Sequence, residues 1–170
     1  MGFFSRWFKG DDGVSSQPSS RLSSRLSSEL EHTPDPVTNI GLDAKTASQV
    51  LAEIDIDRAI ESHENWKVRL RKVLEGHSDE QFDLEVVRRD DCCALGQWLH
   101  GPGQRRLGKY PAFTVLVARH QYFHTQASAV LEHVQTGRNA MAEQVFNSAY
   151  RHGSNQVILL LKELKRGLGG

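Results

Sequence analysis

Three histidines occupy positions where helical periodicity calls for an apolar side chain. His63 falls in an apolar stripe over residues 56–73, and His120 and His124 interrupt a second stripe over residues 113–134. Residues four apart lie on one face of a helix with their Cβ atoms about 5–6 Å apart, so His120 and His124 can reach the same ion. A buried imidazole without a partner is costly, and a metal ion is one partner that satisfies it.

By itself the His-x-x-x-His pair is a weak indication of metal binding, because helices with two histidines at this spacing are common. The third histidine strengthens the indication, and a cysteine would complete the set, since zinc prefers four nitrogen or sulfur ligands in a tetrahedron. The chain has two neighbouring cysteines, Cys92 and Cys93. Neighbouring cysteines form a strained bridge at best, so they do not indicate a disulfide framework.

The elements that must position these residues are predicted to be helices. A long first helix begins near Leu42 and ends at Gly76, and a brief helix runs from Asp90 or Asp91 to the Gly101–Gly103 break. Residues 82–87 are apolar but too short to assign. The inward residues of the first helix are Ile56, Ile60, His63, Trp66, Leu70 and Val73.

Two further long helices follow. The third carries the stripe of Phe113, Leu116, Val117, His120, Phe123, His124, Ala127, Val130, Leu131 and Val134, and it ends at Gly137. The fourth runs from about Asn139 to Arg166, with Met141, Val145, Ala149, Leu159 and Leu160 on its inner side. Long helices with short connections predict an all-α fold, an antiparallel four-helix bundle over residues 42–170.

The overall composition excludes some classes of function. Lys+Arg and Asp+Glu both number 21, so the formal net charge is zero. A nucleic-acid partner would require a basic face, and none is predicted. No apolar stretch reaches the roughly 18 residues that a membrane span needs, and the first ten residues are too short and too charged for a secretory signal. We therefore expect a cytoplasmic protein with reduced thiols.

Residues 1–41 differ in composition from the rest of the chain and are predicted to be a disordered tail, because serine dominates residues 15–28 and Pro18, Pro34 and Pro36 interrupt the region. Its SSRLSSRLSSEL repeat is interpreted as a solvated linker, with a thin amphipathic helix as the alternative. Residues 1–10 form an aromatic and basic tip. We expect this tip to dock either to the surface of the inner membrane or to a protein. The alternative is a frayed terminus. The tip residues are Phe3, Phe4, Arg6, Trp7, Phe8 and Lys9.

The segment that begins at Cys93 carries a family resemblance. It reads Cys-Ala-Leu-Gly-Gln-Trp-Leu and resembles the signature of the bacterial chemoreceptor zinc-binding (CZB) domain. The likeness extends from about residue 44 to 166 and includes His63 and Trp66 before the motif and Arg119–His124 after it. The resemblance implies zinc (Zn²⁺) bound by His63, Cys93, His120 and His124. It also implies a four-helix bundle that pairs as a homodimer.

Family members report zinc or oxidant levels to an attached chemoreceptor or diguanylate cyclase. We therefore predict a sensory or regulatory module that signals to a protein partner in trans, in chemotaxis or cyclic-di-GMP control. The alternative is a docking scaffold in which zinc is only a structural staple. A metal-dependent enzyme is disfavoured, because four protein ligands leave no open zinc position and we expect no inward carboxylate beside the site.

Further residues carry narrower expectations. Cys93 is expected to be a thiolate at neutral pH, because it lies near a helix N-terminus and beside a cation, so that its oxidation would release zinc. Cys92 is interpreted as a spare thiol. His152 is placed near the inner side of the fourth helix as a core or dimer-contact residue, with a place beside the zinc ligands as the alternative. Trp66 and Trp98 are expected to pack in the core.

Overall fold

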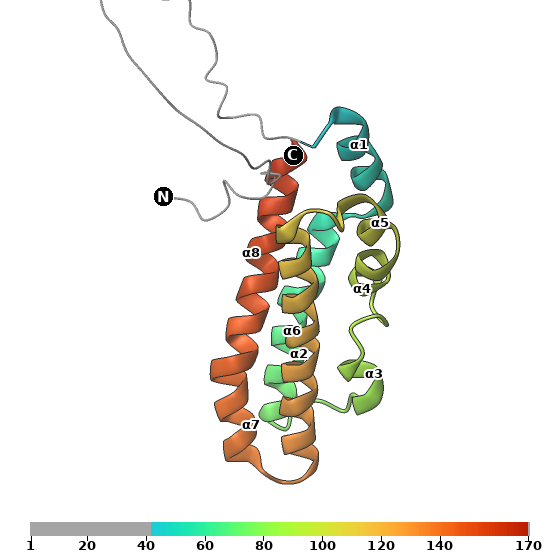
Figure 1. Cartoon of the computed structure of the whole chain (residues 1–170). Helices are drawn as coiled ribbons and strands as arrows, with labels where there is room; N and C mark the ends of the chain where they lie inside the picture. The colour runs from blue at the N-terminus through green and yellow to red at the C-terminus, as the bar shows by residue number, and fades with distance from the viewer. Residues whose placement is uncertain (1–41, 170) are drawn as a thin grey trace, which may run out of the picture.

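The computed structural model describes residues 42–169 (Figure 1). This part of the chain contains helices and no strand, so the predicted all-α class is confirmed. None of its helices is long and apolar enough to cross a membrane. The predicted disordered tail and aromatic tip lie outside the described residues. The helices are α1 (Ala44–Glu53), α2 (Ile56–Leu74), α3 (Leu84–Arg88), α4 (Ala94–Trp98), α5 (Gln104–Leu107), α6 (Pro111–Gln135), α7 (Asn139–Val145) and α8 (Arg151–Gly167).

Local sequence signals explain where the first helices begin and end. Asp43 and Asp55 cap α1 and α2, because each carboxylate accepts a hydrogen bond from a backbone N–H three residues later. The expected single first helix is therefore divided, and Ile54 between the two halves has extended backbone. Gly76 and Gly137 end α2 and α6 as predicted, each with a φ of 71° that favours glycine.

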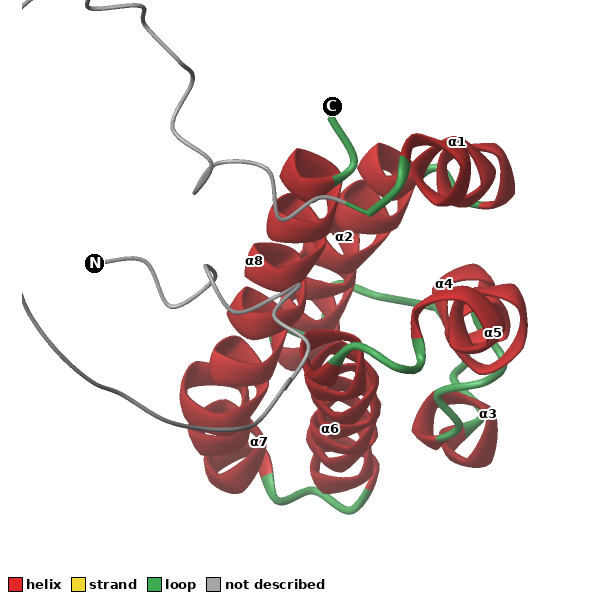
Figure 2. Ribbon diagram, turned by 45° about the horizontal axis from the view of Figure 1, so that its top comes forward, coloured by secondary structure: helices red, strands yellow, loops and turns green. Residues whose placement is uncertain are grey.

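Three long rods form the body of the molecule: α2, α6, and the α7–α8 pair joined by a π-helical turn at Phe146–Tyr150. The short helices α1, α3, α4 and α5 lie along one side of these rods (Figure 2). The region of the expected brief second helix holds α4 and α5, which are separated by a kink at Gly101 with φ −110° and ψ −107°. The structure therefore does not establish the predicted four-helix bundle as such.

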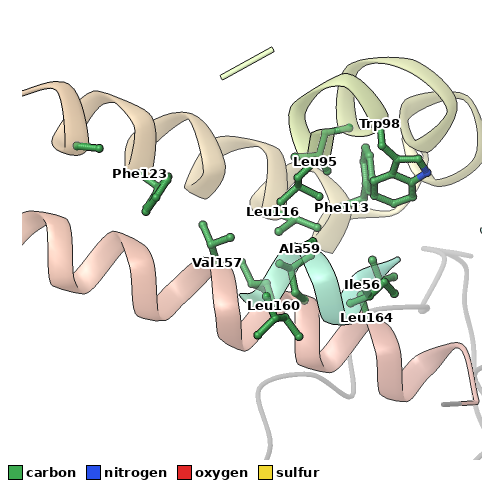
Figure 3. Close-up of a cluster of buried hydrophobic side chains, with 14 of the residues drawn as sticks. Ile56, Ala59, Leu95, Trp98, Phe113, Leu116, Phe123, Val157, Leu160 and Leu164 are labelled. Carbon is green, nitrogen blue, oxygen red and sulfur yellow. The ribbon is translucent and has the colours of Figure 1, made fainter. Parts of the chain in front are cut away.

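The buried core joins the long rods to the short helices (Figure 3). The Trp98 ring of α4 packs edge-on against Phe113 of α6, with 5.8 Å between the ring centroids. This contact docks α4 on the first turns of α6, and Trp98 is buried as predicted. The labelled core residues are Ile56 and Ala59 of α2, Leu95 and Trp98 of α4, Phe113, Leu116 and Phe123 of α6, and Val157, Leu160 and Leu164 of α8.

The inner face of α7 and α8 agrees with the prediction only in part. Of the expected inward residues, Leu160 is buried, Val145 and Ala149 are half-buried, and Met141 and Leu159 are 46% and 45% exposed. The buried row consists of Ala142, Phe146, Tyr150, Val157, Leu160, Leu161 and Leu164. Two neighbouring rows are both apolar in the sequence, and the row with the large aromatic rings is the one that packs against α6, where Tyr150 meets Phe123 at 5.5 Å. His152 is exposed, so it is not a core residue, and its expected role as a dimer contact stays a prediction.

Candidate metal centre

The four predicted ligands come from three different elements. His63 lies in the middle of α2, His120 and His124 lie on α6, and Cys93 is the residue that caps α4. The three imidazoles are 3%, 0% and 4% exposed. Because α2 packs against α6, and Trp98 of α4 packs against Phe113 of α6, the fold brings residues far apart in the sequence to one place.

Three of the four residues form a tight group. The Sγ of Cys93 lies 3.3 Å from Nε2 of His120, and the His120 and His124 ring centroids are 4.6 Å apart. One donor atom from each of Cys93, His120 and His124 lies within 4.8 Å of the others. His63 lies outside this group but beside it, with its ring centroid 5.4 Å from that of His120. The structure thus gathers three predicted ligands and places the fourth next to them.

Hydrogen bonds indicate which nitrogen of two histidines is free to bind a metal. Nδ1 of His63 lies 2.7 Å from the Ala59 carbonyl oxygen, and Nδ1 of His124 lies 2.7 Å from the Val87 carbonyl oxygen. A carbonyl oxygen only accepts, so Nδ1 must carry the proton and donate it. The Nε2 atoms of both rings then hold lone pairs, and both are buried without a hydrogen-bond partner. Such a set of nitrogen and sulfur donors fits zinc.

Burial also keeps the imidazoles in the neutral form that binds metals. Loss of solvent lowers the pKa of His63 from its ordinary 6.5 to about 4. Burial, with the neighbouring His124 and His63 as smaller causes, lowers the pKa of His120 to about 2. Burial lowers the pKa of His124 as well. At neutral pH no proton has to leave these rings before a metal binds.

The Cys93 thiol behaves differently from the prediction. Its Sγ accepts a hydrogen bond from the Gly96 N–H at 3.3 Å, as expected at a helix N-terminus. Burial nevertheless raises the pKa of the thiol above its ordinary value, and the nearby Asp90 carboxylate raises it further. The expectation of a thiolate held by a cation is therefore wrong for the metal-free protein. A metal that binds Cys93 must displace its proton.

The second cysteine lies apart from the metal-binding group. Cys92 is exposed, and its Sγ lies 3.7 Å from a carboxylate oxygen of Asp91. It belongs to no group of potential metal ligands among residues 42–169. This placement agrees with its interpretation as a spare thiol.

A close backbone approach explains the glycine of the Cys-x-Leu-Gly-x-Trp-Leu motif. A Cβ atom on Gly96 would lie 1.6 Å from the carbonyl oxygen of Asp90. Real Cβ atoms do not come so close to backbone, so only glycine allows the segment before Cys93 to lie against α4. Gly96 therefore positions the thiol although it binds nothing itself.

Two polar residues beside the site were not predicted. An Oδ2 atom of Asp90 lies 2.8 Å from Nε2 of His100 and 3.8 Å from Nδ1 of His120. The expectation that no carboxylate lies beside the site is thus wrong. The sequence offered one signal, since Asp90 lies three residues before Cys93, but it gave no indication that Asp90 faces α6.

A cavity of about 210 Å³ opens next to the metal-binding residues. The residues that line it include His63, Cys93, His124, Trp66 and Trp98. The metal-binding residues therefore border a cavity.

Comparison with known proteins agrees with this geometry. Residues 63–131 match the family model of the chemoreceptor zinc-binding domain. The matched segment begins at His63 and contains Cys93, His120 and His124. No curated protein and no solved structure matches the chain.

Proposed function

Residues 63–131 belong to the chemoreceptor zinc-binding domain family, and we propose that the chain binds one zinc ion through His63, Cys93, His120 and His124 as a regulatory ligand. The observation that carries this proposal is the group of buried donor atoms. The Nε2 atoms of His63 and His124 have lone pairs and no partner, and Cys93 lies against His120. Zinc would satisfy all of these atoms at once.

A regulatory role is favoured over catalysis because four protein ligands would complete the usual tetrahedral shell of zinc. The Asp90 carboxylate approaches His120 from Nδ1 and not from Nε2, the nitrogen nearest Cys93. It is therefore poorly placed to activate a water molecule on the metal. The matching family is described as a chemoreceptor zinc-binding domain, which supports a regulatory role.

Zinc bound in this way would connect α2, α4 and α6. A metal ion that joins separate helices stabilises their arrangement by several kcal/mol or more. Loss of the ion would therefore change how these helices pack. In the proposed bundle, the short helices around α4 act as the fourth member beside the three long rods. We propose that this change is transmitted to a protein partner, with a homodimer as the signalling unit. The proposed setting is cytoplasmic, with residues 1–10 available for docking to a membrane surface.

Metal analysis tests the ligand set. Protein purified without added metal should contain one zinc per chain, and changing His120 and His124 together to alanine should abolish it. A matched control is His77→Ala, since the His77 side chain is exposed. A double variant that retains full zinc would show that the ligands are wrong.

Zinc affinity separates the sensor from the structural staple. A sensor must exchange zinc near free cellular concentrations, which competition with chelators of graded affinity measures. A staple keeps its zinc against all but the strongest chelators, and that result would favour the docking scaffold. Affinity capture of partners with and without zinc chelation then tests signalling, and an identical set of partners under both conditions would contradict it.

A further inference from the structure

The three buried histidines differ in what their second ring nitrogen faces. His63 and His124 each donate Nδ1–H to a backbone carbonyl at 2.7 Å. Nδ1 of His120 is also buried, but it has no hydrogen-bond partner. The acceptor near it is a carboxylate, Oδ2 of Asp90, at 3.8 Å. That distance exceeds a hydrogen bond by less than about 1 Å, so a small rotation of either side chain closes it.

We propose that Asp90 is the positioning residue of His120: its carboxylate accepts Nδ1–H, aims Nε2 at the metal and balances the charge of the bound ion. This inference rests on the proposed zinc site. Asp90 would act through His120, whereas the four ligands would bind the metal themselves. Metal-bound histidines commonly donate their other N–H to a carboxylate or a carbonyl, and this partner sets the orientation and basicity of the ring.

Asp90 is itself held in place from two sides. Its carbonyl oxygen lies against Gly96, in the space that a Cβ atom would occupy, and this contact fixes the backbone. Its carboxylate lies 2.8 Å from Nε2 of His100, and its side chain is only 16% exposed. The neighbouring Asp91 instead pairs with Arg89 on the surface. The geometry thus separates two adjacent aspartates into one that faces the site and one that does not.

The charge of the site gives Asp90 a second task. Zinc carries two positive charges, the Cys93 thiolate contributes one negative charge, and neutral imidazoles contribute none. The buried centre would therefore keep one net positive charge. A buried charge without a counter-charge is unfavourable, and the Asp90 carboxylate brings the sum to zero.

The metal-free arrangement is already consistent with this role. The Sγ of Cys93 lies 3.3 Å from Nε2 of His120, and a neutral thiol in this contact would donate its S–H to that nitrogen. An imidazole that accepts at Nε2 carries its proton on Nδ1, and that N–H points to Asp90. When zinc displaces the thiol proton, His120 keeps the same tautomer.

The test compares Asp90→Asn and Asp90→Ala with the matched control Asp91→Asn. Asparagine keeps the shape and an acceptor but removes the charge, whereas alanine removes the acceptor as well. Both changes at Asp90 should weaken zinc binding about 10- to 100-fold, as the loss of such outer partners typically does. Asp91→Asn should stay within about twofold of the unaltered protein. Asp90→Glu should recover part of the loss, which a merely structural role for Asp90 would not explain.

A second measurement needs no metal. In ¹⁵N-labelled metal-free protein, two-bond correlation spectra report which nitrogen of His120 carries the proton. We expect Nδ1–H in the unaltered chain and in Asp91→Asn, and a mixture of tautomers in Asp90→Ala. If an Asp90 variant loses its helical circular dichroism signal and so does not fold, the His120 tautomer in the unaltered chain and in Asp90→Glu still tests the role of Asp90.

Two results would overturn the proposal: a proton on Nε2 of His120 in the unaltered metal-free protein, or zinc binding by Asp90→Asn as tight as by Asp91→Asn. A different result concerns the proposed function. If the unaltered protein binds no zinc, the zinc site fails, and the tautomer measurement still decides the role of Asp90.

Discussion

Acid should destabilise the metal-free protein, because it must fold with neutral buried histidines. In the unfolded chain a histidine takes up a proton near its ordinary pKa of about 6.5. In the folded protein, burial lowers the pKa of His63 to about 4 and that of His120 to about 2. The unfolded state therefore binds more protons over this interval, so stability falls as the pH drops below about 6.5.

The size of the effect follows from these values. Between about pH 7 and pH 5, one histidine shifted from 6.5 to about 4 costs about 1.8 kcal/mol of unfolding free energy. His120 contributes a similar amount over the same interval, since it too remains neutral when folded. The two together cost about 4 kcal/mol, which is a large part of the 5–15 kcal/mol that stabilises a typical domain. His124 adds to the loss in the same direction.

Urea unfolding followed by far-UV circular dichroism, with zinc chelated, measures this difference at the two pH values. His63→Leu replaces the imidazole with an apolar side chain, so the acid-induced loss should shrink by about 2 kcal/mol. Only the difference between the two pH values is compared, because the substitution also changes packing. His77→Leu should keep the full loss, since the His77 side chain is exposed. An equal acid-induced loss in His63→Leu and the unaltered protein would refute the reasoning.

Three other outcomes are expected. Gly96→Ala should destabilise the domain by several kcal/mol and weaken zinc binding, because the new Cβ would collide with the Asp90 carbonyl. Thermal unfolding and zinc titration check this, and an unchanged thermal midpoint would contradict it. In metal-free protein a thiol reagent should modify the exposed Cys92 before the half-buried Cys93, and added zinc should change the rate of the Cys93 reaction only. Mass spectrometry of time points measures the order, and the reverse order would be inconsistent with the site. Deletion of residues 1–41 should leave the helical circular dichroism signal and the thermal midpoint nearly unchanged, because the core described above is formed within residues 42–169. A large loss of stability would mean that residues 1–41 pack on the domain.

The oxidant response expected from the sequence needs a different starting point. Because burial raises the pKa of Cys93, the metal-free thiol is mainly protonated at neutral pH and reacts slowly. Zinc would deprotonate it, so the zinc-bound sulfur would be the more reactive form. An oxidant response carried by Cys93 would therefore begin from the metal-bound protein, and it stays a prediction.

Much of the helical pattern was readable from the sequence because its signals are local. Gly76 and Gly137 end α2 and α6, because glycine readily adopts the positive φ found at both positions. The apolar stripe on α6 is long enough to define the buried face of that helix. The break at Asp55 was missed, although an aspartate followed by a helical stretch is a capping signal. The inner face of α7 and α8 was predicted only in part, because two adjacent rows are both apolar. Leu160 is buried as expected, whereas Met141 and Leu159 are exposed, and packing against α6, as in the Tyr150–Phe123 contact, decides which row is buried.

For the candidate site, the sequence by itself predicted which histidines and which cysteine belong to it. The three histidines interrupt apolar stripes, and a short motif begins at Cys93. Only the tertiary structure decided the rest. It placed Asp90 against His120, buried the Cys93 thiol enough to raise its pKa, and left Nε2 of His63 and His124 without partners. The physical reason is that residue type and spacing are local properties, whereas burial and the partner of each nitrogen depend on segments that meet only when α2, α4 and α6 pack together.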